Sequence, residues 1–306
     1  MQFIAKFIFT VFTAICSVAH ATEKIEIVWG FNPGSNHANA LRLLINQANQ
    51  DQSKYQFIFG HRPGAGGSIA ANHAAANPDH ALVAMSSSFI IRPYFEQGQN
   101  THNLDDFQPL VVQGIGAPLF LVSNKFRDVD TLFRQNNINI GVSGVGSVSH
   151  LAVDDIAKKI PGSKVVNFKN MVDAMTNAAG NHVDLAIGFF SDSQSLVESG
   201  KLFVIGYTGD KKLDNFPGAH LKSHGMASIT SSHAIYHSNR MDAGRRNEIR
   251  KILAKANQSR SVVEEYKKDL LIPVDYDQNS TAKWYSQQRV FWQTKITEFN
   301  QNVSKQ

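Results

Sequence analysis

The amino-acid sequence predicts an α/β fold with two Rossmann-like lobes around a cleft. Along nearly the whole chain, short apolar segments typical of buried strands alternate with segments that have the period of amphipathic helices. The strands form two sets, and small-residue loops rich in glycine follow three of them. Because strands separated by helices form parallel sheets, two such sets indicate two sheets, one in each lobe.

The first set lies near the N-terminus. It comprises predicted strands at residues 25–29, 55–59 and 82–85 and predicted helices at residues 38–48 and 68–76. Leu41, Leu44 and Ile45 give the first helix an apolar face. Pro78 ends the second helix, because proline cannot continue the hydrogen-bond ladder and disfavours helix in the residue before it.

A second set and a helical tail complete the organisation. Strands are predicted at residues 119–122, 138–142, 165–168, 183–187 and 203–207, and long helices at residues 243–257 and 280–300. Trp284 and Trp292 have the spacing of core residues on a helix, although they could also mark a binding surface. We expect residues 22–122 and 226–306 to form one lobe and residues 123–225 the other, with divisions near Ser123 and Met226.

Residues 1–21 have the pattern of a signal peptide. Lys6 precedes an apolar run, and Ala19-His20-Ala21 fits the small-x-small rule for cleavage. The run is shorter than the roughly 20 residues that span a bilayer, which argues against a membrane anchor. Cys16 is the single cysteine and lies in this segment, so the mature chain has neither a thiol nor a disulfide.

Composition limits the size of the fold and its partners. A chain of 306 residues that is 42% hydrophobic and 18% charged can bury a sizeable core. Without Lys6, 29 lysines and arginines face 25 acidic residues, which gives a net charge of +4. No long basic run accompanies this charge, which argues against nucleic acid as a partner, whereas a mild positive bias suits an anionic ligand.

Three loops share one arrangement, in which a strand leads into small residues and then into a helix. They are Asn32-Pro33-Gly34-Ser35-Asn36, the stretch at residues 63–68, and Ser143-Gly144-Val145-Gly146-Ser147. The first turn of a helix has unpaired N–H groups and a partial positive charge, and glycine lets a ligand approach the backbone. Any one loop could be only a tight turn, but three together favour an anion site at the carboxyl ends of the strands.

Two enzyme-like interpretations of the third loop fit less well. A dinucleotide site would need a third glycine where Ser149 stands, and an acidic residue that the next strand lacks. A secreted hydrolase would use Ser143 as nucleophile, but Val145 replaces the last glycine of the nucleophile-elbow pattern.

The chain has twelve histidines, which raises the question of a metal. His220 and His224 are four residues apart, as are His233 and His237. Neither pair encloses the glutamate of a zinc protease, and nearby proline and glycine argue against a helix at the first pair. We therefore expect solvated or hydrogen-bonded histidines, with no metal and no cofactor.

The motifs, taken in order, resemble those of a known family. The stretch "IVWGFNPGSNHANALRL" at residues 27–43 is followed by "HRPGAGGSIAA", "NPDHALVAM", "DDFQPLVV", "GVGSVSHLA" and "GNHVDLAIGFFS". This order resembles the solute-binding proteins of tripartite tricarboxylate transporters, the Bug family, over nearly the whole mature chain. The resemblance implies a type II periplasmic-binding-protein fold, in which crossing strands join two lobes that close over a small carboxylate.

The resemblance also implies where a ligand is held. Loop backbone and ordered water would bind it from both lobes, and Asp184 would lie in the cleft or stabilise a lobe. The candidate ligand-binding residues are Phe31, Gly34, Ser35, Asn36, His37, Gly64, Ala65, Gly66, Gly67, Ser87, Gly146, Ser147, His150 and Asp184.

The first loop departs from the family's pattern. The family usually has Pro-Pro-Gly-Gly-Ser-Thr-Asp, whereas this chain has Asn-Pro-Gly-Ser-Asn-His-Ala at residues 32–38. Either the ligand differs from the commoner dicarboxylates, or Asn36 caps the next helix differently around the same ligand. His37 either becomes protonated beside a bound carboxylate, near its usual pKa of about 6.5, or points into solvent.

The resulting expectation is a periplasmic receptor and not an enzyme. It would act as a monomer, capture a small organic anion and deliver it to the membrane permease subunits of a tripartite tricarboxylate transporter. The alternatives are a secreted α/β hydrolase of a small ester or carboxylate, and a ligand sensor without a dedicated transporter.

Overall fold

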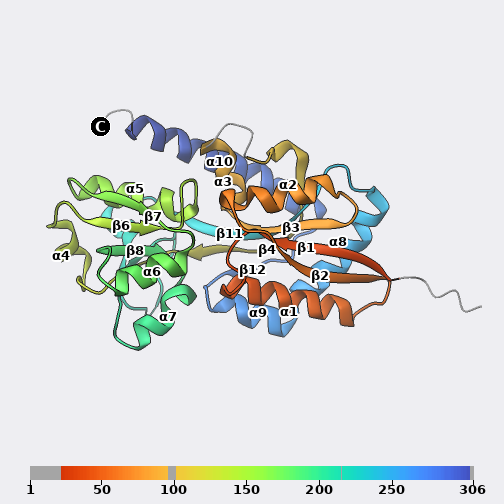
Figure 1. Ribbon diagram of the computed structural model, residues 1–306, viewed down its shortest axis with the longest axis horizontal. Helices are drawn as coiled ribbons and strands as arrows, with labels where there is room; N and C mark the ends of the chain where they lie inside the picture. Colours follow the sequence, from red (N-terminus) through yellow and green to blue (C-terminus); the bar gives the residue numbers. More distant parts are fainter. Residues whose placement is uncertain (1–21, 96–100, 215, 304–306) are drawn as a thin grey trace, which may run out of the picture.

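The protein consists of two lobes that lie side by side in the computed structural model, which describes residues 22–95, 101–214 and 216–303 (Figure 1). Each lobe contains a six-stranded mixed sheet with helices packed against it. The predicted two-lobed α/β fold is therefore confirmed. The predicted signal peptide lies outside the described residues.

The first sheet takes strands from both ends of the chain, in the order β12-β4-β11-β3-β1-β2. Its parallel part is β1 between β2 and β3, and β11 pairs antiparallel with both β3 and β4. The strands are β1 (Glu23–Trp29), β2 (Tyr55–His61), β3 (Ala81–Ser86), β4 (Phe107–Pro118), β11 (Thr230–Ser238) and β12 (Ile272–Pro273). The helices of this part are α1 (Asn36–Gln50), α2 (Ser68–Ala76), α3 (Ser88–Phe95), α8 (Ala243–Asn257), α9 (Arg260–Lys267) and α10 (Gln278–Val303), with short 3-10 turns η1 (Ala65–Gly67) and η2 (Leu104–Asp106).

The second sheet has the order β10-β9-β5-β8-β6-β7. Here β6 is parallel to β7 and β8, whereas β5 is antiparallel to β8 and β9. The strands are β5 (Phe120–Ser123), β6 (Asn139–Val142), β7 (Lys164–Asn167), β8 (Leu185–Gly188), β9 (Phe203–Tyr207) and β10 (Ala219–His220). The helices are α4 (Val129–Phe133), α5 (Val148–Lys159), α6 (Met171–Ala179) and α7 (Phe190–Glu198), with the 3-10 turn η3 (Leu221–His224).

Two long strands connect the lobes. Strand β4 runs out of the first sheet and continues through Leu119 into β5, and β11 returns antiparallel to it, from Thr230 opposite Pro118 to Ser238 opposite Phe107 (Figure 1). The register of this pair shifts between Ser231 and His233, and such bulges redirect side chains. The periodicity of the sequence did not locate either strand.

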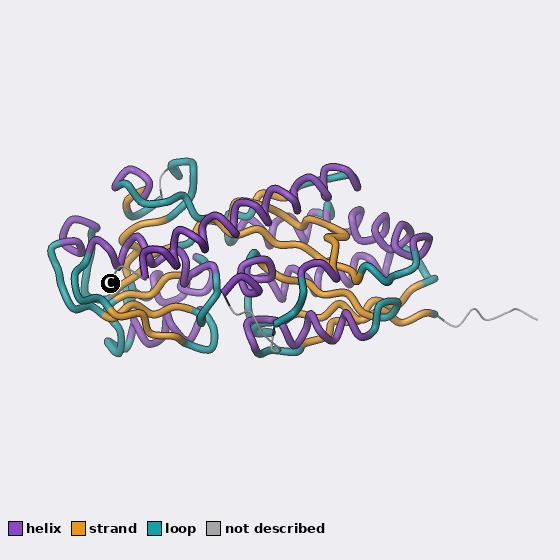
Figure 2. Tube along the Cα trace, turned by 90° about the horizontal axis from the view of Figure 1, so that it is seen from above, coloured by secondary structure: helices purple, strands orange, loops and turns teal. Residues whose placement is uncertain are grey.

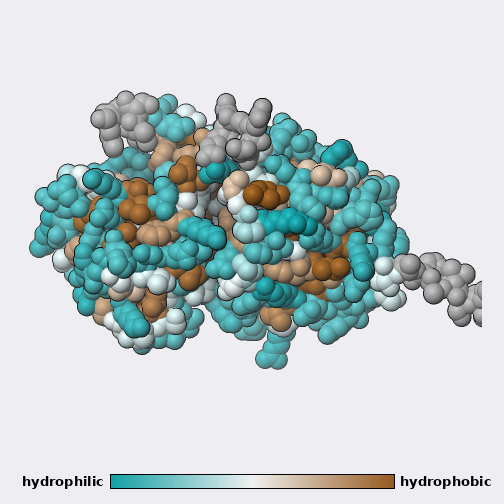
Figure 3. All heavy atoms as spheres, viewed as in Figure 1, coloured by the Kyte–Doolittle hydropathy of each residue, from teal (hydrophilic) through white to brown (hydrophobic). Residues whose placement is uncertain are grey.

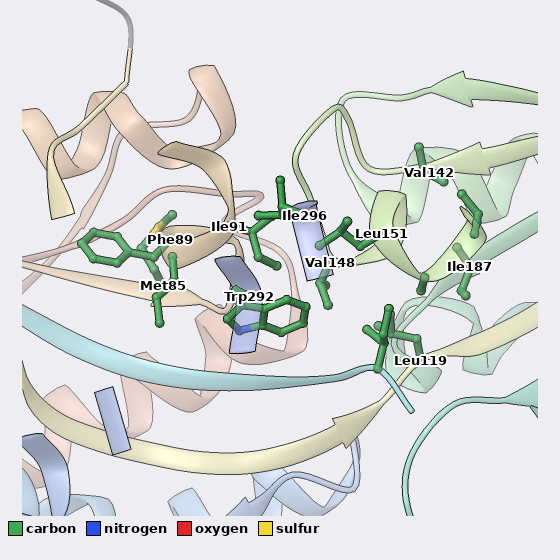
Figure 4. Packing of buried hydrophobic residues seen from close by; sticks show 14 of the residues in the cluster. Met85, Phe89, Ile91, Leu119, Val142, Val148, Leu151, Ile187, Trp292 and Ile296 are labelled. Carbon is green, nitrogen blue, oxygen red and sulfur yellow. The ribbon is translucent and has the colours of Figure 1, made fainter. Parts of the chain in front are cut away.

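Helix α10 spans both lobes and joins their cores. Seen from above, it runs as one long coil across the molecule (Figure 2). Figure 4 shows Trp292 and Ile296 of this helix between Ile91 on one side and Val148 and Leu151 on the other. Trp284 and Trp292 are both buried, so these two aromatic side chains are core residues, as their helical spacing favoured.

Most predicted elements are present, with small differences at their ends. The helices predicted at residues 68–76 and 243–257 and the strand at residues 203–207 have those bounds. The strand predicted at residues 183–187 is displaced to Leu185–Gly188, because Asp184 is held beside Asn139 before the ladder begins. The tail helix is longer than predicted and begins at Gln278.

The surface in Figure 3 is mostly hydrophilic, with hydrophobic residues in small separate groups. Among the helices that the structure describes, none combines the length and the apolar character that crossing a membrane requires.

Candidate ligand-binding cleft

Two adjoining cavities lie between the lobes. Their walls come from the segments that follow β1, β2 and β3 in one sheet and β6, β7 and β8 in the other. Ligands of open α/β sheets gather beyond these carboxyl ends of the strands. The two cavities share Phe31, Asn32, Ser88, Ser143, Lys169 and Asn170. We call the cavity that is lined by the two glycine loops the outer cavity, and the one that is lined by His37 and His233 the inner cavity.

The outer cavity is built largely from backbone. The loop at residues 63–67 lines it from the first lobe, and the loop at residues 143–147 lines it from the second. Helices α2 and α5 begin directly after these loops, so the positive ends of their dipoles lie at this end of the cleft, although the Val148 and His150 N–H groups of α5 already donate to the Ser88 and Ser147 hydroxyls. Two predicted loops that are 80 residues apart in sequence therefore face one space.

Arg92 of α3 supplies a permanent positive charge to the outer cavity. Its side chain is 9% exposed, lines the cavity and donates to the carbonyl oxygen of Val145 in the other lobe. A Cβ added to Gly66 or Gly146 would stand 3.0 Å or 3.1 Å from Arg92 Cδ. Glycine at these two positions thus makes room for Arg92 between the loops, a role that sequence reasoning missed.

The first loop ends at Ser35. The Ser35 hydroxyl accepts a hydrogen bond from Ala38 N at 3.3 Å and caps α1, so the predicted cap at Asn36 is wrong by one residue. Asn36 is instead the first helical residue, and its side chain donates to Asp269 Oδ2 at 2.9 Å and to the Glu265 carbonyl oxygen at 3.1 Å. Ser35 and Asn36 both line the inner cavity.

His37 is buried, with 5% of its surface exposed, which corrects the interpretation that it points into solvent. Its Nε2 lies 3.2 Å from Gln113 Oε1, and burial lowers its pKa from 6.5 to about 3. The Gln113 amide donates to Tyr266, which donates to Asn257, so the Gln113 oxygen is the acceptor and His37 carries its proton on Nε2. In the ligand-free protein this low pKa keeps the ring neutral near pH 6.5.

Aromatic rings form one side of the inner cavity. The rings of His37 and His233 have centroids 3.7 Å apart, and Trp29 lies 5.0 Å from His37 and 5.3 Å from Phe31. Phe189, which follows β8, lies 5.6 Å from His233. His233 is at the bulge in β11, and burial together with the neighbouring His37 lowers its pKa well below 6.5.

Two carboxyl groups also line the inner cavity. Asp192 is in the first turn of α7, and Asp269 follows α9 from the other lobe. Burial, and after it the charge on Asp269, raise the pKa of Asp192 from 3.8 to about 8, against the opposing effect of a backbone hydrogen bond from Phe189. Burial also raises the pKa of Asp269, although hydrogen bonds from Ser191 and Asn36 stabilise its charged form.

Most of the predicted site residues lie around the cleft. Phe31 lines both cavities, Gly64, Ala65, Gly66, Gly67, Gly146 and Ser147 line the outer one, and Ser35, Asn36 and His37 line the inner one. Gly34, Ser87, His150 and Asp184 line neither.

Three of these residues, Ser87, His150 and Asp184, have structural hydrogen bonds. The Ser87 hydroxyl accepts from Ser232 N of β11 at 2.9 Å, and His150 Nδ1 accepts from Gly146 N at 3.2 Å. Asp184 accepts from Asn139 N at 2.8 Å and pairs with Lys125 at 2.5 Å. Of the two roles expected for Asp184, the geometry fits the one that stabilises a lobe.

The arrangement around Ser143 is not that of a hydrolase. In the described part of the chain, its hydroxyl lies 2.9 Å from the Ser149 hydroxyl, which is in turn 2.9 Å from that of Ser147. A chain of hydroxyls has no base that could accept the proton of a nucleophile. Within the same described residues, no group of three or more His, Cys, Asp or Glu side chains is placed to hold a metal ion.

Sequence reasoning missed Arg92, Lys169, Phe189, Asp192 and Asp269. Lys169 comes directly after a predicted strand and Phe189 two residues after another, so the position of strand ends could have identified them. Asp269 comes from a segment after α9 for which no strand or glycine loop gave a signal.

Comparisons with known proteins agree with this geometry. The family described as "Tripartite tricarboxylate transporter family receptor" matches residues 44–299. The chain belongs to this family. It is a family of solute-binding proteins and not of enzymes, and its members are periplasmic binding proteins.

Individual relatives of this receptor are distant. It is 23% identical over 262 residues, 78% of this chain and 73% of the relative, to the UPF0065 protein in the TAR-I ttuE-ttuC' intergenic region of Agrobacterium vitis. Its fold is similar to the periplasmic binding protein BugD (TM-score 0.79, 17% identity, covering 91% and 98% of the two chains). It is also similar to R. palustris Rpa4515 with adipate (TM-score 0.80, 18% identity, 91% and 98%).

Proposed function

We propose that this receptor captures a small organic carboxylate in the cleft and closes its two lobes over it. The observation that carries the proposal is the outer cavity, where glycine loops from both lobes and the Arg92 guanidinium surround one space. Backbone N–H groups at helix N-termini and a guanidinium are the donors that carboxylates prefer. The similar structure that holds adipate supports the same ligand class.

A binding experiment tests this function. Titration calorimetry and thermal shift with mono-, di- and tricarboxylates are expected to identify a ligand that raises the melting temperature. Arg92→Gln should weaken its binding by about tenfold or more, since a charge-assisted hydrogen bond is lost. Arg134→Gln, at an exposed arginine after α4, is the matched control. Stabilisation by no carboxylate, or equal binding by both variants, contradicts the proposal.

We further propose export through residues 1–21, action as a monomer, and delivery of the ligand to a tripartite membrane permease. Residues 22–122 and 226–306 would move as one lobe against residues 123–225. Cell fractionation with and without residues 1–21, light scattering, and solution scattering with and without ligand test these points. Ligand uptake that does not depend on this receptor would favour the sensor alternative.

A further inference from the structure

The inner cavity differs chemically from an anion site. Asp192 and Asp269 line it together with the rings of Trp29, Phe31 and Phe189. Among the described residues, no lysine, arginine or histidine forms an ion pair with either carboxyl group. A second carboxylate of a ligand would lie near the negative charge of Asp269 here, which is electrostatically unfavourable.

The partners of Asp269 come from both lobes. Asn36 of α1 donates to Oδ2 at 2.9 Å, and the Ser191 amide of α7 donates to Oδ1 at 3.2 Å. Two such donors stabilise an ionised Asp269 inside the cleft. Asp192, one residue after Ser191, therefore lies in the field of this negative charge.

His233 provides an independent indication of a ligand. It is 4% exposed and lines the inner cavity, and its Nδ1 is buried without a hydrogen-bond partner in the described structure. A buried polar atom of this kind is costly unless something in the cavity pairs with it. Burial keeps the His233 ring neutral, so only one of its two nitrogens carries a proton. If Nδ1 is the nitrogen without the proton, it can accept a hydrogen bond from a donor in the cavity.

We propose that the inner cavity receives a positively charged amino group, so that the ligand is a small amino carboxylate. Its ammonium group would lie between Asp192, Asp269 and the aromatic rings, and its carboxylate would face the glycine loops and Arg92. Ammonium donors pair with carboxylates, and aromatic faces attract cations. The inference rests on the proposed function, since it names the ligand class of the same cleft.

Binding of such a ligand is coupled to protons. In the free receptor the high pKa keeps Asp192 protonated near neutral pH, and a cation beside it would favour the charged form. Binding near neutral pH then releases about one proton, and affinity rises as pH increases toward the free pKa of about 8.

The other charged groups around the pair do not account for this pH dependence. His37 has a pKa of about 3 and that of His233 is also far below neutral, so both rings stay neutral. Glu265 acts on Asp269 as a further negative charge, and Lys169 is a cation on the wall that both cavities share. The proton released therefore belongs to the Asp192 and Asp269 pair.

Length-matched ligands test the inference. The probes are γ-aminobutyrate against succinate, δ-aminovalerate against glutarate, and ε-aminocaproate against adipate, each titrated into the mature chain by calorimetry. At least one amino carboxylate is expected to bind about tenfold or more tightly than its matched diacid. Titration in buffers with different ionisation enthalpies should show the released proton for the amino carboxylate alone.

The variant Asp192→Asn provides a second test of the amino-carboxylate ligand. This variant should bind the preferred amino carboxylate about tenfold or more weakly and should release no proton. The neutral amide keeps the shape of the Asp192 side chain but not its charge. Asp130→Asn, an exposed first-turn position of α4, is the matched control and should change neither. The proton measurement on the wild-type chain needs no variant, so it decides the question even if Asp192→Asn does not fold.

The two possible failures can be distinguished. If every diacid binds as tightly as its matched amino carboxylate, or no proton is released, the inference is wrong and the proposed carboxylate receptor stands. If neither the amino carboxylates nor the diacids bind, the inference and the proposed carboxylate function are both wrong.

Discussion

The outer and inner cavities share six residues but are built in different ways. The outer cavity consists of two continuous glycine loops, with Arg92 between them and helices α2 and α5 beginning directly after them. The inner cavity consists of side chains from α1, β11, the segment after β8 and the segment after α9. One cleft thus places groups that bind an anion beside groups that repel it, which favours a ligand with two different ends.

Lowering the pH should destabilise the inner cavity most strongly. The folded pKa of His37 is about 3 against 6.5 for the free side chain, so its contribution to stability is present above pH 6.5 and is lost as pH falls toward 3. Between neutral pH and about pH 4, His37→Gln should lose about 3 kcal/mol less unfolding free energy than the wild type. Denaturant titration at each pH measures this difference.

The control for this prediction is His182→Gln, which removes an exposed histidine. It should follow the wild-type pH profile. Identical profiles for all three proteins would show that the buried His37 ring does not resist protonation.

Gly66→Ala should disturb the outer cavity alone. Gly66 has φ of +60°, which costs alanine about 1 kcal/mol, and the added Cβ would also crowd Arg92 Cδ at 3.0 Å. We expect a loss of about 2 kcal/mol in unfolding free energy and about tenfold weaker carboxylate binding. Thermal unfolding and calorimetry measure both.

Gly200→Ala is the matched control, because Gly200 has φ of +71° with open space around its Cβ position. This variant should lower the unfolding free energy by about 1 kcal/mol and leave carboxylate binding unchanged. Equal effects of the two variants would mean that backbone strain alone, and not the space for Arg92, matters at Gly66.

Asp192→Asn should stabilise the free receptor. The folded pKa of Asp192 is about 8 against 3.8 unfolded, so its favourable contribution is complete below pH 3.8 and is lost as pH rises through 8. Removing the group should raise the unfolding free energy near pH 8 and have no such effect near pH 4. A variant that is less stable than wild type at both pH values would show that Asp192 has a structural role instead.

The smallest expected effect concerns Lys169, which is exposed and lies where the two cavities meet. Lys169→Gln should weaken carboxylate binding by about 0.5 kcal/mol at low salt and by less at high salt, because exposed charges are screened. Lys164→Gln, on β7 away from both cavities, is the control. A difference that does not shrink with added salt would contradict this role.

Parts of the cleft that are formed by adjacent residues could be predicted from the sequence, and parts that are formed by distant segments could not. The loop at residues 63–67 was identified because glycine, strand and helix signals are adjacent there, and the position of a helix N-terminus follows from them. His37 was noticed as a departure from a family pattern, but its burial could not be predicted, since Gln113 and Tyr266 that enclose it are 76 and 229 residues further along the chain. Asp269 gave no local signal at all.

The sequence by itself determined the two-lobed α/β fold, the glycine loops that begin α2 and α5, and the family, because these depend on periodicity and on short contiguous motifs. Only the tertiary structure decided that Arg92 lies between Gly66 and Gly146, that His37 stays neutral in the ligand-free protein, and that Asp192 and Asp269 line one cavity. Charge state and proximity depend on burial and on the path of β4 and β11 between the sheets, and local residue order does not specify either.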